Sequence, residues 1–340
     1  MTKPPLYIRT PVYENPGINT RLNRRIFLKM ECYQPTGSFK ARGIGTLCQR
    51  AVEAGQTALV SSSGGNAGYS AAYAGRVLGV PVTVVVPEST GTTARQRIES
   101  EGAEVIVHGA AWDDADALAR KLVEERGAAY IHPFDNQAIW DGHATMIDEA
   151  ADQCSRPDVV IVAVGGGGLL CGTLEGMHRN GWEDVPVIAV ETRGAASFAA
   201  SIASGTLETL PAITSIASTL GAKTVTPKAL EWAGRHLITP VVVSDASAVD
   251  ACLQFADDLR VVVEPACGAA LSLLYDNAAL LRGAKNVLVI VCGGAGVTHP
   301  QLVSYAQLLR NGNGLRRDRH ELVSGAGANS VTQTVKLPSS

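Results

Sequence analysis

Lys40 is the residue whose type and surroundings point most directly to chemistry in this chain of 340 residues. It ends the segment Pro-Thr-Gly-Ser-Phe-Lys at residues 35–40, and three glycine-rich segments follow further along the chain. A lysine amine does chemistry by forming a Schiff base with a carbonyl compound, and its site must keep the amine nucleophilic. The glycine-rich segments are therefore candidates for holding such a compound around Lys40.

Residues 164–169, Val-Gly-Gly-Gly-Gly-Leu, follow an apolar strand pattern and precede a helical pattern that starts near Leu170. Bare backbone amides at a helix N-terminus bind anions, because the unpaired N–H groups and the helix dipole both favour a phosphate. The alternative is a tight turn that needs only positive φ. Four consecutive glycines exceed the need of one turn, so we expect phosphate binding.

A dinucleotide site can be tested against the Gly-x-Gly-x-x-Gly pattern. Counted from Gly165 the last position is Leu170, and counted from Gly166 it is Cys171. The pattern also fails around Gly293 and Gly294. The sequence therefore disfavours a Rossmann cofactor.

Two further segments follow strand patterns. Residues 61–68, Ser-Ser-Ser-Gly-Gly-Asn-Ala-Gly, open a helical pattern and could bind a substrate carboxylate, although Ser and Asn also cap ordinary helices. Residues 291–296, Val-Cys-Gly-Gly-Ala-Gly, end the last strong strand pattern, where open α/β sheets place ligands. Cys292 could equally be a plain core residue.

Strand and helix patterns alternate along the chain, which predicts parallel sheets covered by helices on both faces. The predicted strands are residues 58–62, 81–87, 104–108, 159–164, 186–191, 240–244 and 286–292, and the clearest helical patterns are 65–78, 113–125 and 247–259.

Composition limits the partners. The net charge of -3, with 18% charged and 46% hydrophobic residues, gives no footprint for nucleic acid or an anionic membrane, so we expect small-molecule partners. The longest run without a polar side chain, residues 159–172, is too short for a bilayer. Seven cysteines without Cys-x-x-Cys spacing indicate a reducing compartment, and we expect the cytoplasm. Residues 311–340 have the composition of a flexible tail.

Taken in order, the motifs of this chain resemble those of the fold type II pyridoxal phosphate enzymes, most closely the serine dehydratase and serine dehydratase-like group. The resemblance runs from about residue 11 to residue 309. Its motifs are residues 35–43 (Pro-Thr-Gly-Ser-Phe-Lys-Ala-Arg-Gly), 63–68 (Ser-Gly-Gly-Asn-Ala-Gly), 133–135 (Pro-Phe-Asp), 140–144 (Trp-Asp-Gly-His-Ala), 164–172 (Val-Gly-Gly-Gly-Gly-Leu-Leu-Cys-Gly), 263–270 (Val-Glu-Pro-Ala-Cys-Gly-Ala-Ala) and 291–294 (Val-Cys-Gly-Gly).

The resemblance implies the two-domain α/β fold of this group, which is tryptophan synthase beta-like. Residues 1–40 and 145–310 would form the large, cofactor-binding domain, residues 41–144 a small domain inserted in it, and residues 311–340 the tail. The active site would lie in the cleft between the domains, and the protein would be a homodimer.

The resemblance also implies roles for single residues. Lys40 would form the Schiff base with pyridoxal 5'-phosphate, Phe39 would pack on the ring, Asn66 would bond the ring hydroxyl and Cys292 would face the pyridine nitrogen. The phosphate would be bound by Gly165, Gly166, Gly167, Gly168 and Leu169. The substrate carboxylate would be bound by Ser63, Gly64, Gly65, Asn66 and Ala67.

A neutral thiol at the ring nitrogen makes the ring a weaker electron sink than a carboxylate would, which suits expulsion of a β-substituent. We therefore expect dehydration and deamination of L-serine, and of L-threonine, to pyruvate or 2-oxobutanoate and ammonia. Lys40 would remove the α-proton, and the cofactor phosphate would protonate the departing hydroxyl. The alternatives are elimination from a bulkier 3-hydroxy amino acid, a β-replacement synthase of the cysteine synthase type, and a non-catalytic binding protein.

Two positions depart from the relatives. Gly64 stands where serine racemases carry a second serine, so we expect poor racemisation and extra room. Thr219 stands where the animal enzymes have a small alanine, and it could tighten the pocket or add a hydrogen bond. His143 and Cys267 lie in matching motifs and are expected to serve packing.

Glu191 matches the monovalent cation site of the family, with K⁺ as the expected ion. Hard cations prefer oxygen ligands of this kind. The alternative is a glutamate near the surface in an ion pair. Backbone carbonyls near Gly165, Ala195, Leu220 and Ala222 would complete the cation site.

Overall fold

The computed structural model describes residues 4–276, 279–311 and 321–322. The predicted tail therefore lies outside the described residues, except for Asn311 and the short strand β11 (Glu321–Leu322).

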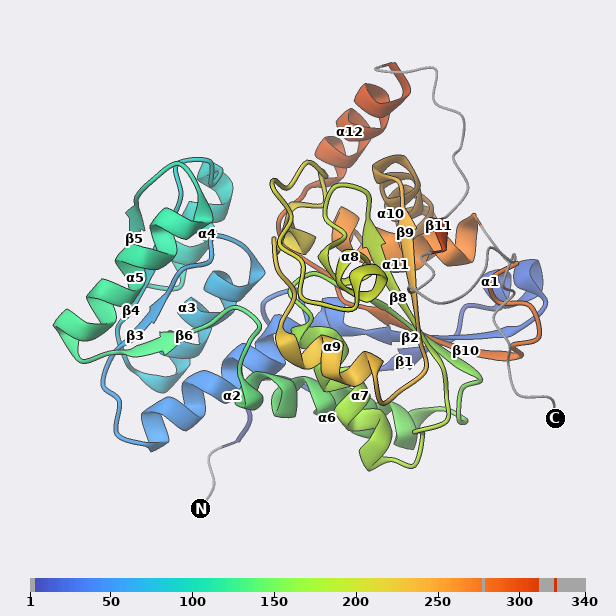
Figure 1. Ribbon diagram of the computed structural model, residues 1–340, viewed down its shortest axis with the longest axis horizontal. Coiled ribbons are helices and arrows are strands. Elements are labelled where there is room, and N and C mark those ends of the chain that lie inside the picture. Colours follow the sequence, from blue (N-terminus) through green and yellow to red (C-terminus); the bar gives the residue numbers. More distant parts are fainter. Residues whose placement is uncertain (1–3, 277–278, 312–320, 323–340) are drawn as a thin grey trace.

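Two separate sheets organise the chain (Figure 1). The larger sheet has the order β1-β2-β10-β7-β8-β9-β11, and its five inner strands run parallel while β1 and β11 pair antiparallel at the edges. Its other strands are β1 (Val12–Tyr13), β2 (Arg25–Met30), β7 (Val159–Ala163), β8 (Val187–Thr192), β9 (Ile238–Val243) and β10 (Asn286–Val291).

The smaller sheet has the order β5-β4-β3-β6 and is entirely parallel. Its strands are β3 (Leu59–Ser61), β4 (Val82–Val86), β5 (Glu104–Val107) and β6 (Ala129–Ile131). The predicted strands are therefore present, and the expected parallel α/β architecture is confirmed. Four strands were missed, among them β2, whose Arg25 and Lys29 interrupt its apolar pattern.

Helices cover both sheets. Helices α3, α4 and α5 pack on the smaller sheet, α11 packs on β7, β8 and β10 of the larger one, and α7 and α8 contact β7 and β9. Helix α2 packs against both α3 and α6, so these helices join the two parts (Figure 1). The helices are α1 (Pro16–Leu22), α2 (Lys40–Glu53), α3 (Asn66–Leu78), α4 (Thr92–Ser100), α5 (Trp112–Arg126), α6 (Gln137–Gln153), α7 (Gly168–Arg179), α8 (Ser197–Ser204), α9 (Pro227–Ala233), α10 (Asp245–Leu259), α11 (Pro265–Tyr275) and α12 (His299–Asn311).

A buried ionic network fixes the start of α2. Arg42 is fully buried and binds Glu31 through Nε (2.7 Å) and Nη2 (2.9 Å), and Glu149 of α6 through Nη1 and Nη2 (2.7 Å each). Lys29 of β2 adds a 2.6 Å bond to the same Glu149. Because a charge buried this deeply needs its partners, the network sets where α2 begins.

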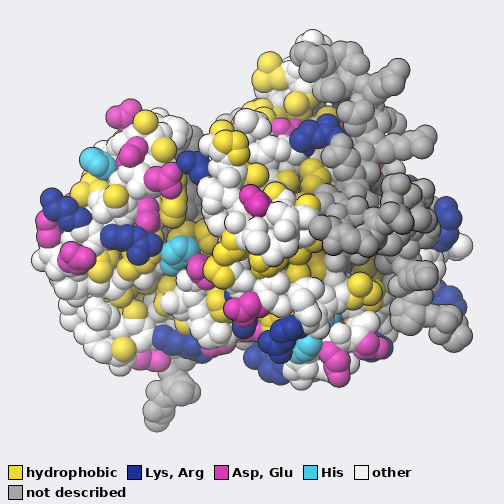
Figure 2. Space-filling view, in the orientation of Figure 1, with side chains coloured by type: hydrophobic (Ala, Val, Ile, Leu, Met, Phe, Trp, Pro, Cys, Tyr) yellow, Lys and Arg dark blue, Asp and Glu magenta, His cyan; other side chains and the backbone are white. Residues whose placement is uncertain are grey.

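No helix among the described residues is long and apolar enough to cross a membrane. On the face shown in Figure 2, acidic and basic side chains are interspersed rather than gathered by sign.

Candidate active site

Lys40 is the first residue of α2, and its backbone position is set by pairing with a distant segment. Phe39 donates a 3.1 Å hydrogen bond to the carbonyl of Cys292, and Gly294 donates one of 2.8 Å to Gly37. At Gly293 φ is +83°, and an added Cβ would lie 2.3 Å from the Gly37 carbonyl oxygen. Only glycine fits this position, so the segment after β10 holds Lys40 beside Cys292.

The amine of Lys40 donates to the carbonyl of Pro133. Burial lowers the pKa of Lys40 to about 8, because desolvation outweighs the opposing influence of Cys292 and Glu264. A larger share of this amine is therefore neutral at physiological pH than for an exposed lysine, as a nucleophilic lysine requires.

The four-glycine segment joins β7 to α7, with Gly167 at φ +88°. An added Cβ at Gly166 would lie 2.3 Å from the ring of Phe134, and one at Gly168 would lie 2.6 Å from the Phe134 carbonyl oxygen. Close packing is thus one reason for these glycines. Within the described residues, the amides of Gly165, Gly166 and Gly167 donate no hydrogen bond, which leaves them for an anion at the N-terminus of α7.

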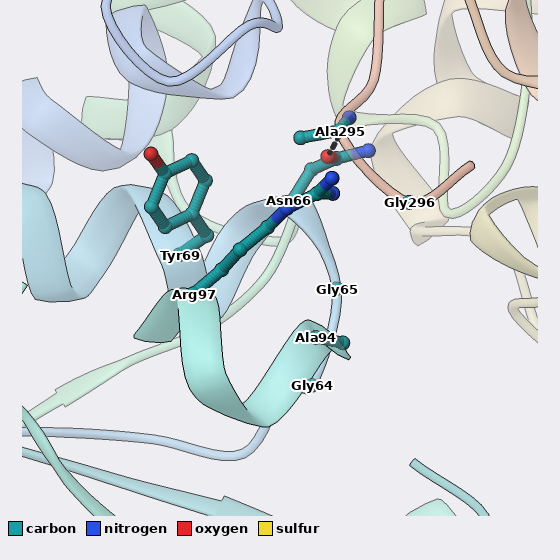
Figure 3. Close-up of a pocket in the computed structure, with 8 residues that line it drawn as sticks. All are labelled: Gly64, Gly65, Asn66, Tyr69, Ala94, Arg97, Ala295 and Gly296. Carbon is teal, nitrogen blue, oxygen red and sulfur yellow. Dashed lines mark hydrogen bonds between the residues drawn. The ribbon is translucent and has the colours of Figure 1, made fainter. Parts of the chain in front are cut away.

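Asn66 opens α3, and its amide is held at both ends. Its Nδ2 donates to Oε1 of Glu264 at 2.7 Å, and its Oδ1 accepts from the amide of Ala295 at 3.0 Å (Figure 3). Ser63 lies in the same turn, where its Oγ accepts a 3.4 Å bond from the amide of Gly65. The structure therefore brings the segment 63–67 next to the segment after β10.

The space beside Gly64 is occupied. A Cβ added at this position would lie 2.7 Å from both Cγ2 and Oγ1 of Thr90. The expectation that Gly64 leaves extra room is wrong on the side where a Cβ would point, because Thr90, in the loop after β4, fills that space.

A small, open pocket lies beside this turn. In Figure 3 the side chain of Arg97 extends from α4 towards Asn66. Arg97 is the only charged lining side chain, and its guanidinium forms no hydrogen bond or ion pair with the described residues. The lining residues are Gly64, Gly65, Asn66, Tyr69, Ala94, Arg97, Ala295 and Gly296.

Cys292 and Phe39 complete the surroundings of Lys40. Cys292 is buried, and a hydrogen bond with Cys267 together with burial raises the pKa of its thiol, so it stays neutral. The ring of Phe39 lies 4.8 Å from the ring of His143, measured between centroids. His143 is fully buried with neither ring nitrogen bonded, which fits the packing role predicted for it.

Sequence reasoning missed the role of Glu264. Glu264 lies in the motif at residues 263–270, but nothing in that motif indicates that its carboxylate contacts Asn66 and Thr219. Thr219 Oγ1 donates to Oε1 of Glu264 at 2.6 Å, so the structure decides that Thr219 adds a hydrogen bond.

Glu191 belongs to β8, and its side-chain carboxylate lies at the start of α8. Its two carboxylate oxygens accept from the amides of Phe198 (2.9 Å) and Ala199 (2.7 Å), and burial raises its pKa to about 8. The alternative of a surface ion pair is wrong, because Glu191 is fully buried. Gly165 approaches Leu220, and Ala195 donates to Thr192. The carbonyl of Leu220 accepts from Ala222 at 2.8 Å.

The sequence model of the pyridoxal-phosphate dependent enzyme family matches residues 4–293. The chain belongs to this family. Among its relatives, the L-serine dehydratase of Dictyostelium discoideum is 43% identical over 91% of this chain and 94% of its own length. The serine dehydratase-like protein of Homo sapiens is 46% identical, with coverages of 88% and 93%. The human L-serine dehydratase/L-threonine deaminase is 44% identical, with coverages of 89% and 95%.

Solved structures agree. The fungal L-serine ammonia-lyase of Rhizomucor miehei matches with a TM-score of 0.86 and 39% identity, over 89% of this chain and 99% of that one. A maize serine racemase matches with a TM-score of 0.80 and 27% identity, over 90% and 94%. The fold type II assignment of this family member is thereby confirmed.

The site fits the family's cofactor. Unpaired amides at the N-terminus of α7 suit its phosphate, and a lysine amine with a lowered pKa suits its carbonyl. Asn66 keeps one N–H of its amide free of the bonds described above.

Proposed function

We propose that this family member is an L-serine dehydratase that also accepts L-threonine and releases pyruvate or 2-oxobutanoate with ammonia. The observation that carries the proposal is the neutral thiol of Cys292 held beside Lys40, where a carboxylate would favour longer-lived carbanions. The names of the relatives support the same reaction.

The bound cofactor would supply an electrophilic carbonyl and an electron sink. The amides of residues 165–169 would bind its phosphate, and Asn66 would donate to its ring hydroxyl. Phe39 would pack against its ring, and Cys292 would face its ring nitrogen. Lys40 would carry the proton taken from the α-carbon of the substrate.

The turn at residues 63–67 would bind the substrate carboxylate through Ser63, Gly64, Gly65, Asn66 and Ala67. Thr90 limits the space beside this turn. This limit favours serine and threonine over a bulkier 3-hydroxy amino acid.

We also propose a K⁺ site at Glu191, because its buried carboxylate forms no ion pair with a basic side chain of the described residues. We further propose two domains and a homodimer. The large domain would comprise residues 1–40 and 145–310, and the small domain residues 41–144.

The seven free cysteines support a reducing compartment, for which we propose the cytoplasm.

The decisive experiment incubates the cofactor-loaded protein with L-serine, L-threonine and L-threo-phenylserine and measures keto acid and ammonia. We expect the fastest release from L-serine, loss of turnover in Lys40→Ala, and higher rates in potassium than in sodium. Glu191→Gln should remove the difference between the two ions. If the protein binds the cofactor but releases neither keto acid nor ammonia from L-serine and L-threonine, the proposal is rejected.

A further inference from the structure

Glu264 is a buried carboxylate to which the proposed reaction gives no part. It lies at the N-cap of α11 and is 4% exposed. Oε1 accepts from Asn66 Nδ2 (2.7 Å) and Thr219 Oγ1 (2.6 Å), and Oε2 accepts from the amide of Gly296 (3.3 Å). Within the described residues it has no ion-pair partner at salt-bridge distance.

A glycine leaves the space that the Glu264 carboxylate occupies. An added Cβ at Gly294 would lie 1.9 Å from Cδ of Glu264, so only glycine leaves space for the carboxylate there. A buried carboxylate is costly unless its oxygens are bonded and a positive charge is near. Here neutral donors supply the bonds, and the positive charge of Lys40 lowers the pKa of the carboxyl.

The titratable groups that sense Glu264 are Lys40, Cys252 and Cys292. Burial raises the pKa of Glu264, and the bonds from Thr219, Gly296 and Asn66 together with Lys40 oppose that rise. Burial also keeps both thiols neutral. None of these three groups is a carboxyl, and the charges of Glu264 and Lys40 stabilise each other.

Glu264 also decides which end of the Asn66 amide faces the site. An amide has one acceptor oxygen and two N–H donors. Because the oxygen accepts from Ala295 and one N–H donates to Glu264, the second N–H remains for a ligand. The flipped amide would place its oxygen against a carboxylate oxygen, which is repulsive.

We propose that Glu264 is a positioning residue of the cofactor site, which orients Asn66 and sets the charge beside Lys40, and that Thr219 holds its carboxylate in place. This inference rests on the proposed function, in which Asn66 and Lys40 bind the cofactor. We assign this role to Thr219 because its hydroxyl donates the shortest of the three hydrogen bonds to Glu264.

The first test compares the holoenzyme with Glu264→Gln, which removes the charge at nearly constant shape. The readout is the pH dependence of the absorption spectrum of the bound cofactor, without substrate. Without Glu264 the nitrogen of Lys40 loses its counter-charge, so the midpoint of the spectral transition should fall by about one pH unit or more. Glu183→Gln, at an exposed glutamate, should leave the midpoint unchanged.

The second test uses Thr219→Val and Thr219→Ser, which differ in whether a hydroxyl is present. The valine variant should lower the midpoint in the same direction and weaken cofactor binding about tenfold in equilibrium dialysis, and the serine variant should restore both. If Glu264→Gln does not fold, these two Thr219 variants test the role of Glu264 instead. Equal midpoints in the wild-type protein and Thr219→Val would overturn the role of Thr219, and an unchanged midpoint in folded Glu264→Gln would overturn the whole inference.

Failure of the proposed function is separately visible. A wild-type protein that binds cofactor through Lys40 but releases no pyruvate from L-serine would reject the reaction. The midpoints of the spectral transition are measured without substrate, so they would still test the positioning role of Glu264.

Discussion

At the scale of single residues, the site depends on side chains whose neighbours alter their chemistry. Lys40 has an amine with a pKa lowered by burial, Cys292 has a thiol kept neutral, and Glu264 is a carboxylate held by neutral donors. Each of these properties comes from residues far away in the chain.

The lowered pKa of Lys40 predicts how the stability of the cofactor-free protein changes with pH. The folded pKa is about 8 against an ordinary value of 10.5, so between these values the unfolded chain binds more protons. Stability contributed by this group therefore rises as pH rises from 8 to 10.5. Urea unfolding at pH 8 and pH 10 should show a larger gain for the wild-type protein than for Lys40→Met. Equal gains would contradict the shift.

The contact between Gly64 and Thr90 predicts coupled mutations. Gly64→Ser should lose stability and activity, because the new side chain overlaps Thr90. Adding Thr90→Ala should restore part of the loss, with a coupling energy of about 1 kcal/mol in a double-mutant cycle. Additive effects in thermal unfolding and in kcat/KM would show that the two side chains do not share this space.

At the scale of elements, two devices place the start of α2. One is the backbone pairing between residues 37–39 and the segment after β10, and the other is the buried network around Arg42. Together they bring a helix that packs against α3 and α6 to the end of β10, where its first residue meets the ligand site.

The pairing predicts a strong effect of Gly293→Ala. The substitution is strained at φ +83° and would clash with the Gly37 carbonyl oxygen. We expect cofactor binding to weaken at least about tenfold, because Lys40 is displaced. The control is Gly79→Ala, at φ +75° with nothing within 4 Å. Similar cofactor affinities in the two variants would contradict the pairing's role.

The network predicts different costs for two arginines of the same helix. Arg42→Met leaves Glu31 without an ion-pair partner and Glu149 with Lys29 alone, and it should cost about 3 to 5 kcal/mol of unfolding free energy. Arg50→Met breaks only the half-exposed pair with Asp141 and should cost less than about 1 kcal/mol. Urea unfolding of both variants checks the difference, and equal costs would refute it.

At the scale of the whole molecule, the candidate pocket lies between the part built on the smaller sheet and the part built on the larger one. Most of its lining comes from α3, α4 and the turn before α3, and Ala295 and Gly296 come from the segment after β10. The site therefore requires both parts, joined by α2 and α6.

Arg97 predicts how the pocket contributes to binding. Its guanidinium forms no hydrogen bond or ion pair with the described residues, and its side chain extends towards Asn66 in the turn proposed to bind the substrate carboxylate. Arg97→Gln should raise KM for L-serine about tenfold and change kcat less than about threefold, because binding rather than chemistry is affected. Steady-state kinetics test this, and a loss confined to kcat would contradict it.

The sequence by itself determined the alternating α/β fold, the family, and the candidates Lys40, Asn66 and the four-glycine segment. These depend on local order along the chain, namely apolar runs, helix starts and glycine clusters, which are readable without coordinates. Strand β2 was missed because Lys29 breaks its apolar pattern, and only its distant partner Glu149 explains a buried lysine. Likewise only the tertiary structure decided that Thr90 fills the space at Gly64 and that Thr219 bonds Glu264. Thr219 and Glu264 are 45 residues apart, and a contact between such residues is created by folding rather than by any pattern in the sequence.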